Sequence, residues 1–148
     1  MSASVVELTL TQQDNYRIRL DFGDDVPALI GDEPPPLGQS VGPAPQQLLL
    51  AAVSNCLVDS LQFALSKYHQ NASPLRGEAR ATIDRNEHGR LRVQSIEVTL
   101  RLGQPADSIE HLDRILDGFE DYCTVSQSVA KGIPTTVRVL GNDGRVLK

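Results

Sequence analysis

The chain has 148 residues, 40% of them hydrophobic, with a formal net charge of −5 and a sequence pI of about 5.1. Its Lys and Arg residues are scattered, which argues against a nucleic-acid-binding surface, because such a surface needs clustered basic side chains. No apolar run approaches the roughly 20 residues of a membrane span, and the N-terminus has neither the basic flank nor the apolar core of a signal peptide. We therefore expect a single cytoplasmic domain over residues 1–148, with no nucleic-acid or membrane partner.

The first third of the chain predicts a small group of strands. Residues 5–13 and 16–22 alternate apolar and polar side chains on either side of an Asp-Asn pair, as two strands joined by a tight turn do. Residues 26–31 are consistent with a short edge strand. Residues 32–45 contain five prolines. Because proline lacks the N–H that a helix or a central strand needs, we interpret this segment as an ordered surface loop.

A long apolar helix is predicted over residues 44–71. Pro45 suits the first turn of a helix, and the sequence LLLAAVS after Gln47 is apolar on nearly every side. A helix that is apolar all round is buried. Polar residues return toward the end of the segment, so we expect its N-terminal half to enter a core and its C-terminal half to meet water.

A β-hairpin is predicted next. Residues 76–85 and 90–102 alternate with period two and are joined by the short loop NEHG. The apolar positions change parity between Val93 and Ile96, which indicates a β-bulge.

The remaining chain predicts two helices and two strands. Residues 107–122 carry an apolar stripe at helical spacing, with Asp107 or Ser108 as the cap. A second, short helix follows, with Thr124 as its cap and Gly132 at its end. Residues 133–141 and 145–148 read as strands around an Asn-Asp-Gly turn. Strands adjacent in sequence form antiparallel hairpins, so the fold class is α+β.

The chain has only two cysteines, Cys56 and Cys123, too few for a secreted disulfide scaffold. Cys123 precedes the short helix, whose N–H groups and dipole favour a thiolate and lower the pKa of a thiol; alternatively, it is a small buried residue that continues the apolar stripe. By pattern alone Cys56, inside the long helix, is a core residue. Two thiols on packed helices can form a disulfide if their Cα atoms approach within about 7 Å, which the sequence leaves open.

The ordered motifs DEPPPLG, GPAPQQLLLAAVSNCL and YCTVSQSV resemble those of the OsmC/Ohr family (osmotically inducible protein C and organic hydroperoxide resistance proteins). The resemblance implies an intertwined homodimer, with antiparallel sheets around a central buried helix and two sites at the subunit interface. It also implies thiol-dependent reduction of organic hydroperoxides. We expect no cofactor. Cys56 would be the peroxidatic nucleophile that becomes a sulfenic acid. Cys123 would be the resolving thiol, and an external dithiol would reduce the resulting disulfide.

The sequence departs from the family at one position. Better-characterised peroxidases of the family carry a Glu ten residues before the first cysteine, paired with an Arg that activates the thiolate. Here that position is Gln46, a neutral amide that can donate or accept a hydrogen bond but adds no charge. Arg17 is our candidate for the arginine and Arg19 the alternative, since both lie on one face of the predicted strand; either side chain could equally belong to a solvated strand face.

Three other interpretations stay open from the sequence. The first is a non-catalytic dimer of the same fold that binds an apolar small molecule. The second is a structural homodimer. The third, a metal site using both cysteines and a histidine, has little support, because His69, His88 and His111 are isolated and no Cys-x-x-Cys spacing is present. We expect no metal.

Overall fold

The computed structural model describes residues 2–23 and 25–148, and the chain divides into two compact units at Leu48/Leu49. The first unit runs from residue 1 to 48 and the second from residue 49 to 148. Helix α1, Pro45–Lys67, starts in the first unit and continues through the second. The single domain expected over residues 1–148 stays a prediction.

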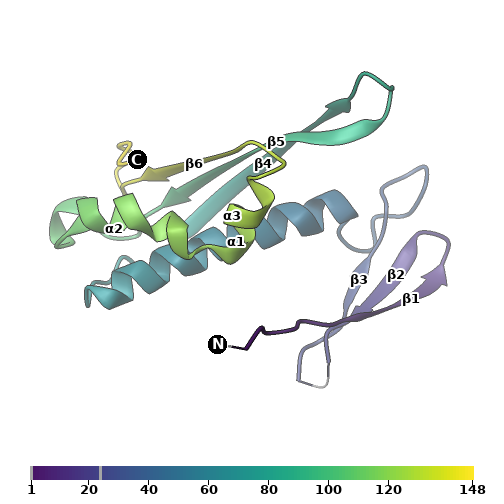
Figure 1. Ribbon diagram of the computed structural model, residues 1–148, viewed down its shortest axis with the longest axis horizontal. Helices are drawn as coiled ribbons and strands as arrows, with labels where there is room; N and C mark the ends of the chain where they lie inside the picture. Colours follow the sequence, from purple (N-terminus) through teal and green to yellow (C-terminus); the bar gives the residue numbers. More distant parts are fainter. Residues whose placement is uncertain (1, 24) are drawn as a thin grey trace. The chain divides into compact units, whose positions relative to one another are not determined.

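The first unit holds an antiparallel three-stranded sheet in the order β1-β2-β3 (Figure 1). Its strands are β1, Thr9–Asp14, β2, Arg17–Asp21, and β3, Leu29–Gly31. The predicted hairpin and edge strand are therefore present, with shorter strands than expected. Asn15, in the turn, has a positive φ of 46°, a conformation that asparagine tolerates better than most residues.

The second unit holds a mixed sheet in the order β4-β5-β6. Strand β4, Arg76–Arg85, pairs antiparallel with β5, Leu91–Arg101, and β5 pairs parallel with β6, Thr135–Leu140. The α+β class is confirmed, but the expectation of purely antiparallel sheets is wrong. A helical segment separates β5 from β6 and returns the chain to the same end of the sheet, which makes the pairing parallel. The strand predicted at residues 145–148 is reduced to one bridge between Leu140 and Val146.

The predicted β-bulge is confirmed in the hairpin of β4 and β5. Thr82 pairs with Ser95, whereas the next residue, Ile83, pairs with Val93. Gln94 is therefore the extra residue of β5. It lies between the two apolar positions whose parity differs, so Ile96 returns to the core face and is fully buried.

The helical segment between β5 and β6 differs from its prediction at both predicted caps. A 3-10 turn covers Ala106–Ser108, and α2 begins only at Leu112 and ends at Gly118. Its N-cap is His111, in the left-handed conformation with φ 58°, so Asp107 and Ser108 do not cap it.

A second 3-10 turn, Phe119–Tyr122, leads to α3, Thr124–Val129. The cap of α3 is Cys123 and not Thr124, because the Cys123 sulfur takes the place of the hydroxyl oxygen. The helix ends before Gly132, with Ala130 as its C-cap.

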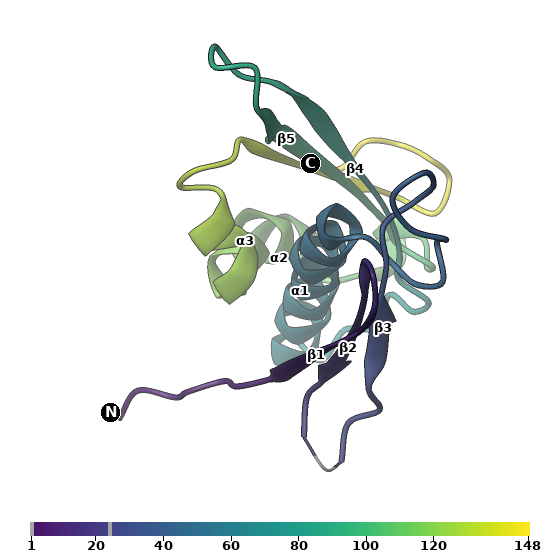
Figure 2. The same ribbon diagram turned by 90° about the vertical axis from the view of Figure 1, so that its right-hand side faces the viewer.

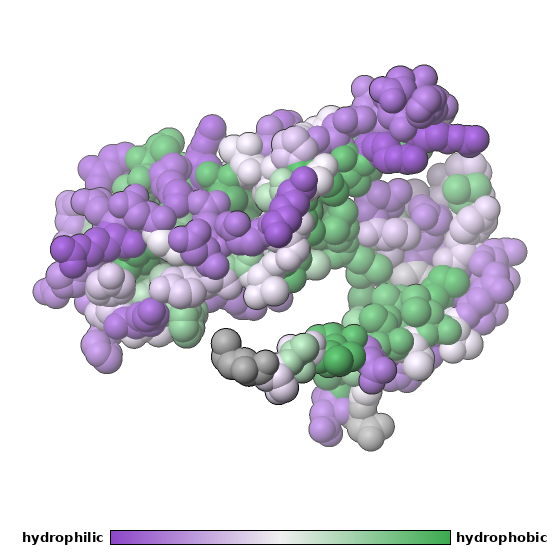
Figure 3. All heavy atoms as spheres, viewed as in Figure 1, coloured by the Kyte–Doolittle hydropathy of each residue, from purple (hydrophilic) through white to green (hydrophobic). Residues whose placement is uncertain are grey.

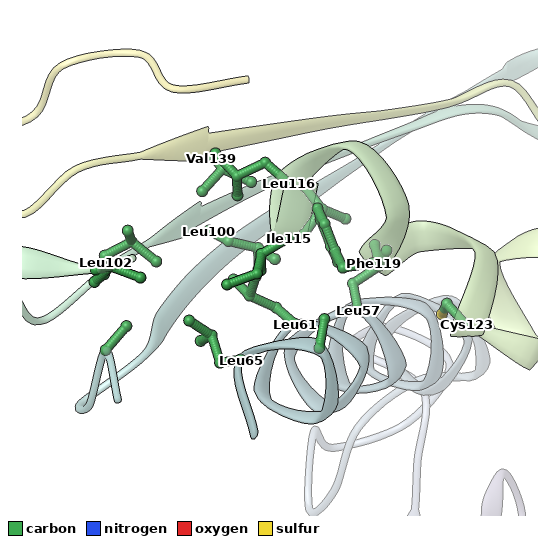
Figure 4. Close-up of a cluster of buried hydrophobic side chains, with 14 of the residues drawn as sticks. Leu57, Leu61, Leu65, Leu100, Leu102, Ile115, Leu116, Phe119, Cys123 and Val139 are labelled. Carbon is green, nitrogen blue, oxygen red and sulfur yellow. The ribbon is translucent and has the colours of Figure 1, made fainter. Parts of the chain in front are cut away.

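The hydrophobic core lies in the second unit. Figure 2 shows α1, α2 and α3 on one face of the β4–β5–β6 sheet. The helix residues Leu57, Leu61 and Leu65 are fully buried and belong to one cluster with sheet and α2-segment side chains (Figure 4). The other members of the cluster drawn there include Leu100, Leu102, Ile115, Leu116, Phe119, Cys123 and Val139.

The burial of α1 is the reverse of our expectation. Its buried residues run from Val53, near the middle, to Leu65, near the end, whereas Ala51 and Ala52 are exposed. By length and composition α1 could cross a membrane. A buried face in the core explains the same composition, since the central helix of a soluble protein passes the same test.

Candidate redox site

The structure brings the two cysteines together from α1 and the start of α3. Both thiols are free; Cys56 is partly exposed and Cys123 is fully buried. Cys56 packs against the core cluster that contains Cys123, and Cys123 is near enough to raise the pKa of the Cys56 thiol. Two adjacent thiols are the arrangement from which a sulfenic acid can condense to a disulfide.

Local backbone geometry holds Cys123 in this position. Its φ and ψ of −84° and 95° are extended, so it stands outside the helix as the N-cap. The Ser126 N–H donates to the Cys123 sulfur at 3.4 Å, and the Gln127 N–H donates to the Cys123 carbonyl oxygen at 3.1 Å. The first turn of α3 therefore fixes the sulfur, and Figure 4 shows Cys123 beside α1 at the end of the row of core side chains.

The pKa of Cys56 is raised above that of an ordinary thiol. Burial is the largest cause, and the hydrogen bond and charge of Cys123 raise it further. The backbone N–H groups of Val125 and Ser126 act in the opposite direction but do not compensate. With these groups alone, Cys56 is mostly a neutral thiol near pH 7, and a nearby positive charge would increase its thiolate fraction.

Arg17 and Arg19, the two candidate arginines, have different environments in the first unit. Arg17 Nη2 donates to Gln39 Oε1 at 3.2 Å, and its Nε is buried without a hydrogen-bond partner among residues 2–23 and 25–148. Arg19 is exposed and pairs with Asp21 at 3.5 Å. Arg17 is thus the better-held guanidinium.

Gln46 lies in the first turn of α1 and is exposed. Arg17 and Gln46 belong to the first unit, and the two thiols belong to the second. The relation of Arg17 and Gln46 to the thiols stays a prediction.

Asp32 was not identified from the sequence. It is 4% exposed, and its carboxylate accepts backbone N–H bonds from Glu33, Gln39 and Val41 at 2.9, 3.1 and 3.2 Å. Burial favours the neutral acid, but these three N–H donors, with the nearby charge of Arg17, lower its pKa below the usual value. Asp32 is therefore a carboxylate at neutral pH.

One sequence signal accompanies Asp32. At Gly38 a Cβ would lie 2.3 Å from Asp32 Oδ1, so only glycine lets the loop close around this carboxylate. A glycine in a proline-rich segment has many explanations, however, and the sequence gives no reason to choose this one.

The sequence profile described as OsmC-like protein matches residues 38–138. The chain belongs to the OsmC family. No curated protein is significantly similar to it in sequence.

Solved structures of the family share the fold over nearly the whole chain. An OsmC-like protein of unknown function from Vibrio cholerae is 14% identical with a TM-score of 0.78, and the match covers 93% of this chain and 100% of that one. An organic hydroperoxide resistance protein from Elizabethkingia anophelis is 17% identical with a TM-score of 0.74, and the match covers 95% of this chain and 99% of that one. The organic hydroperoxide resistance protein OhrB of Bacillus subtilis is 14% identical with a TM-score of 0.68, and the match covers 92% of this chain and 98% of that one.

Proposed function

We propose that this OsmC-family protein is a thiol-dependent peroxidase that reduces organic hydroperoxides. The observation that supports the proposal is the pair of adjacent free thiols, Cys56 partly exposed and Cys123 buried beside it. An accessible thiol can meet a peroxide, and a protected neighbour can resolve the product. The hydroperoxide-resistance proteins among the structural neighbours fit this chemistry.

The reaction uses one hydroperoxide and both thiols. The Cys56 thiolate attacks the distal oxygen, the O–O bond breaks, and the alcohol leaves with a proton while Cys56 becomes a sulfenic acid. The Cys123 thiolate then attacks the Cys56 sulfur and releases water, which forms the disulfide. An external dithiol reduces the disulfide by exchange and restores both thiols.

Arg17 and Gln46 complete the proposed site. A guanidinium near Cys56 would favour its thiolate and offset the burial that raises its pKa. Gln46 would supply a neutral hydrogen bond in place of a carboxylate. The carbon-rich surroundings of α1 would favour organic peroxides over hydrogen peroxide.

We also propose that the protein acts as a cytoplasmic homodimer. Apolar side chains of the first unit are exposed in the single chain, and Figure 3 shows them gathered over its sheet. Exposed apolar patches of this kind mark interaction surfaces. Those on or beside the sheet are Leu8, Leu10, Tyr16, Phe22, Val26 and Leu29.

The test is the intact-protein mass and free-thiol count after one equivalent of cumene hydroperoxide. Wild type should lose both thiols quickly, with a mass decrease of two hydrogens. Cys123→Ser should trap a sulfenic acid on Cys56, and Cys56→Ser should not react. Unchanged thiols in wild type over minutes would refute the peroxidase.

A second candidate function is a non-catalytic dimer that binds an apolar small molecule. The observation in its favour is a cavity of about 330 Å³ within the first unit, which is lined mainly by apolar side chains, among them Leu10, Tyr16, Ile18, Leu20, Pro43 and Leu48. Its volume lies in the usual range for ligand pockets. Saturable binding of an apolar fluorophore, together with unreactive thiols, would favour this function.

A further inference from the structure

Arg17 is held by a short chain of hydrogen bonds that starts at Asp32. The Asp32 carboxylate accepts the backbone N–H of Gln39, and the Gln39 side-chain oxygen accepts a hydrogen bond from Arg17. Arg17, Gln39 and Asp32 line one cavity of about 200 Å³ in the first unit. The position of the guanidinium therefore depends on the loop that Asp32 organises.

The loop has several features that make its geometry specific. Asp32 Oδ2 receives the N–H groups of both Gln39 and Val41, which lie on either side of Ser40. Ser40 itself has a positive φ of 55°, a conformation that costs free energy outside glycine and persists only where surrounding contacts fix it. The two bonds to one carboxylate oxygen are such contacts.

The buried carboxylate also supplies the negative charge near Arg17. Burying an unpaired carboxylate is expensive, so three N–H donors and a neighbouring guanidinium are needed to keep Asp32 charged. Gln46 is neutral and exposed, and no hydrogen bond joins it to Arg17 among residues 2–23 and 25–148. Asp14 lines the same cavity but is exposed to solvent, where its charge is screened.

We infer that Asp32 is the positioning residue of Arg17. Through the loop and the Gln39 side chain, Asp32 fixes the guanidinium so that its Nε–H remains available to another group. The inference rests on the proposed function, in which Arg17 assists the Cys56 thiolate. It assigns to Asp32 and Gln39 the task of orienting the arginine, and it makes a charge at position 46 unnecessary for this task.

The experiment follows the Arg17 Nε–H signal and the thiol reaction in the full-length protein. The ¹⁵N relaxation of Arg17 Nε–H, assigned with Arg17→Lys, reports whether the guanidinium is rigid. The rate of Cys56 oxidation by cumene hydroperoxide reports the consequence. The variants are Gln39→Ala, Gln39→Glu and Asp32→Asn, and the matched control is Gln13→Ala, an exposed glutamine on β1.

We expect a rigid Arg17 Nε–H in wild type, Gln13→Ala and Gln39→Glu, because each keeps the oxygen that accepts from Arg17. Gln39→Ala and Asp32→Asn should show a mobile signal and oxidise Cys56 at least tenfold more slowly, since misplacing a positioned group by about 1 Å can cost up to a hundredfold. Gln39 is exposed, so Gln39→Ala should keep its thermal midpoint and remain informative even if Asp32→Asn unfolds the loop.

Two results would overturn the inference. One is an Arg17 signal that stays rigid in Gln39→Ala. The other is a mobile signal with an unchanged oxidation rate, which would show that the position of Arg17 does not matter for the thiols. If wild type itself fails to react with peroxide, the proposed function is wrong, and the relaxation data alone then decide whether Asp32 and Gln39 hold Arg17.

Discussion

The Cys56 thiol is harder to ionise than an ordinary thiol because it is partly buried and lies against Cys123. We expect its alkylation by iodoacetamide, followed by peptide mass, to be slow near pH 7 and to keep rising through the alkaline range. In Cys123→Ala the rise should shift to lower pH, because one cause of the raised pKa is removed. An unchanged profile in Cys123→Ala would contradict this prediction, whereas a wild-type midpoint at or below that of an ordinary thiol would indicate that a guanidinium offsets the burial, as proposed for Arg17.

The same raised pKa makes stability depend on pH. The folded state holds the Cys56 proton more tightly than the unfolded state does, so this contribution is fully present below the pKa of an unfolded thiol. It is lost as the pH rises through the raised pKa of the folded state. The free energy of unfolding in urea should therefore fall more steeply in alkaline solution for wild type than for Cys56→Ser. If the unfolding free energies of wild type and Cys56→Ser fall equally with rising pH, this prediction is wrong.

For single residues, the sequence identified the side chains that could react, but it did not identify the contacts that hold them in place. Cys56 and Cys123 could be selected because cysteine is rare in this chain and each lies in a recognisable motif. Their contact could not be predicted, since it depends on how α3 packs against α1. Asp32 was missed because an aspartate before prolines usually faces solvent, and its burial arises from backbone N–H groups up to nine residues away.

Among the elements, α1 ends in a Schellman motif that contains a strained residue. The Gln70 N–H donates to the Leu65 carbonyl at 2.9 Å and the His69 N–H to the Ser66 carbonyl at 3.0 Å. His69 is exposed and has a positive φ of 55°. Glycine adopts this conformation without steric cost, so His69→Gly should stabilise the protein by about 1 kcal/mol.

Chemical denaturation of His69→Gly measures this gain. The control is His88→Gly, which changes an exposed histidine in the hairpin loop whose φ is not positive. The control should be neutral or slightly destabilising, because glycine increases the entropy of the unfolded chain. Equal effects in the two variants would show that the left-handed conformation of His69 carries no cost.

The spacing of apolar residues along the sequence predicted the strands of this fold better than its helices. The alternation around Val93 and Ile96 located the bulge, because a single extra residue must reverse the faces of a strand. The start of α2 was missed, because the apolar stripe continues through Ile109 and gives no sign that His111 turns left-handed. The parallel pairing of β6 was also hidden, since it depends on the path of the chain between strands.

For the whole molecule, the core of the second unit should dominate stability. Leu57 is fully buried on the core face of α1, whereas Phe63, six residues further along, is 51% exposed. Leu57→Ala should cost about 2–5 kcal/mol of unfolding free energy, the range measured for buried leucines. Phe63→Ala should cost much less in a single chain, so a comparably large loss would indicate that a partner covers Phe63.

The exposed sheet of the first unit leads to the last prediction, which concerns assembly. Leu10 on β1 is 64% exposed, and its side chain lines the apolar cavity of the first unit. If a second copy covers this surface, sedimentation equilibrium should give twice the chain mass of 16.1 kDa. Leu10→Lys should then weaken the dimer at least tenfold, about 1.4 kcal/mol, because it places a charge in an apolar interface.

The control for assembly is Thr11→Lys. Thr11 is the next residue of β1 and is also exposed, but its side chain points to the opposite face of the sheet. Thr11→Lys adds the same charge at nearly the same place as Leu10→Lys. A dimer that dissociates equally in both variants would therefore indicate general charge repulsion. A wild-type protein that sediments as a monomer would refute the homodimer. In that case the exposed half of α1 and the apolar side chains of β1 and β2 would need a different partner to cover them.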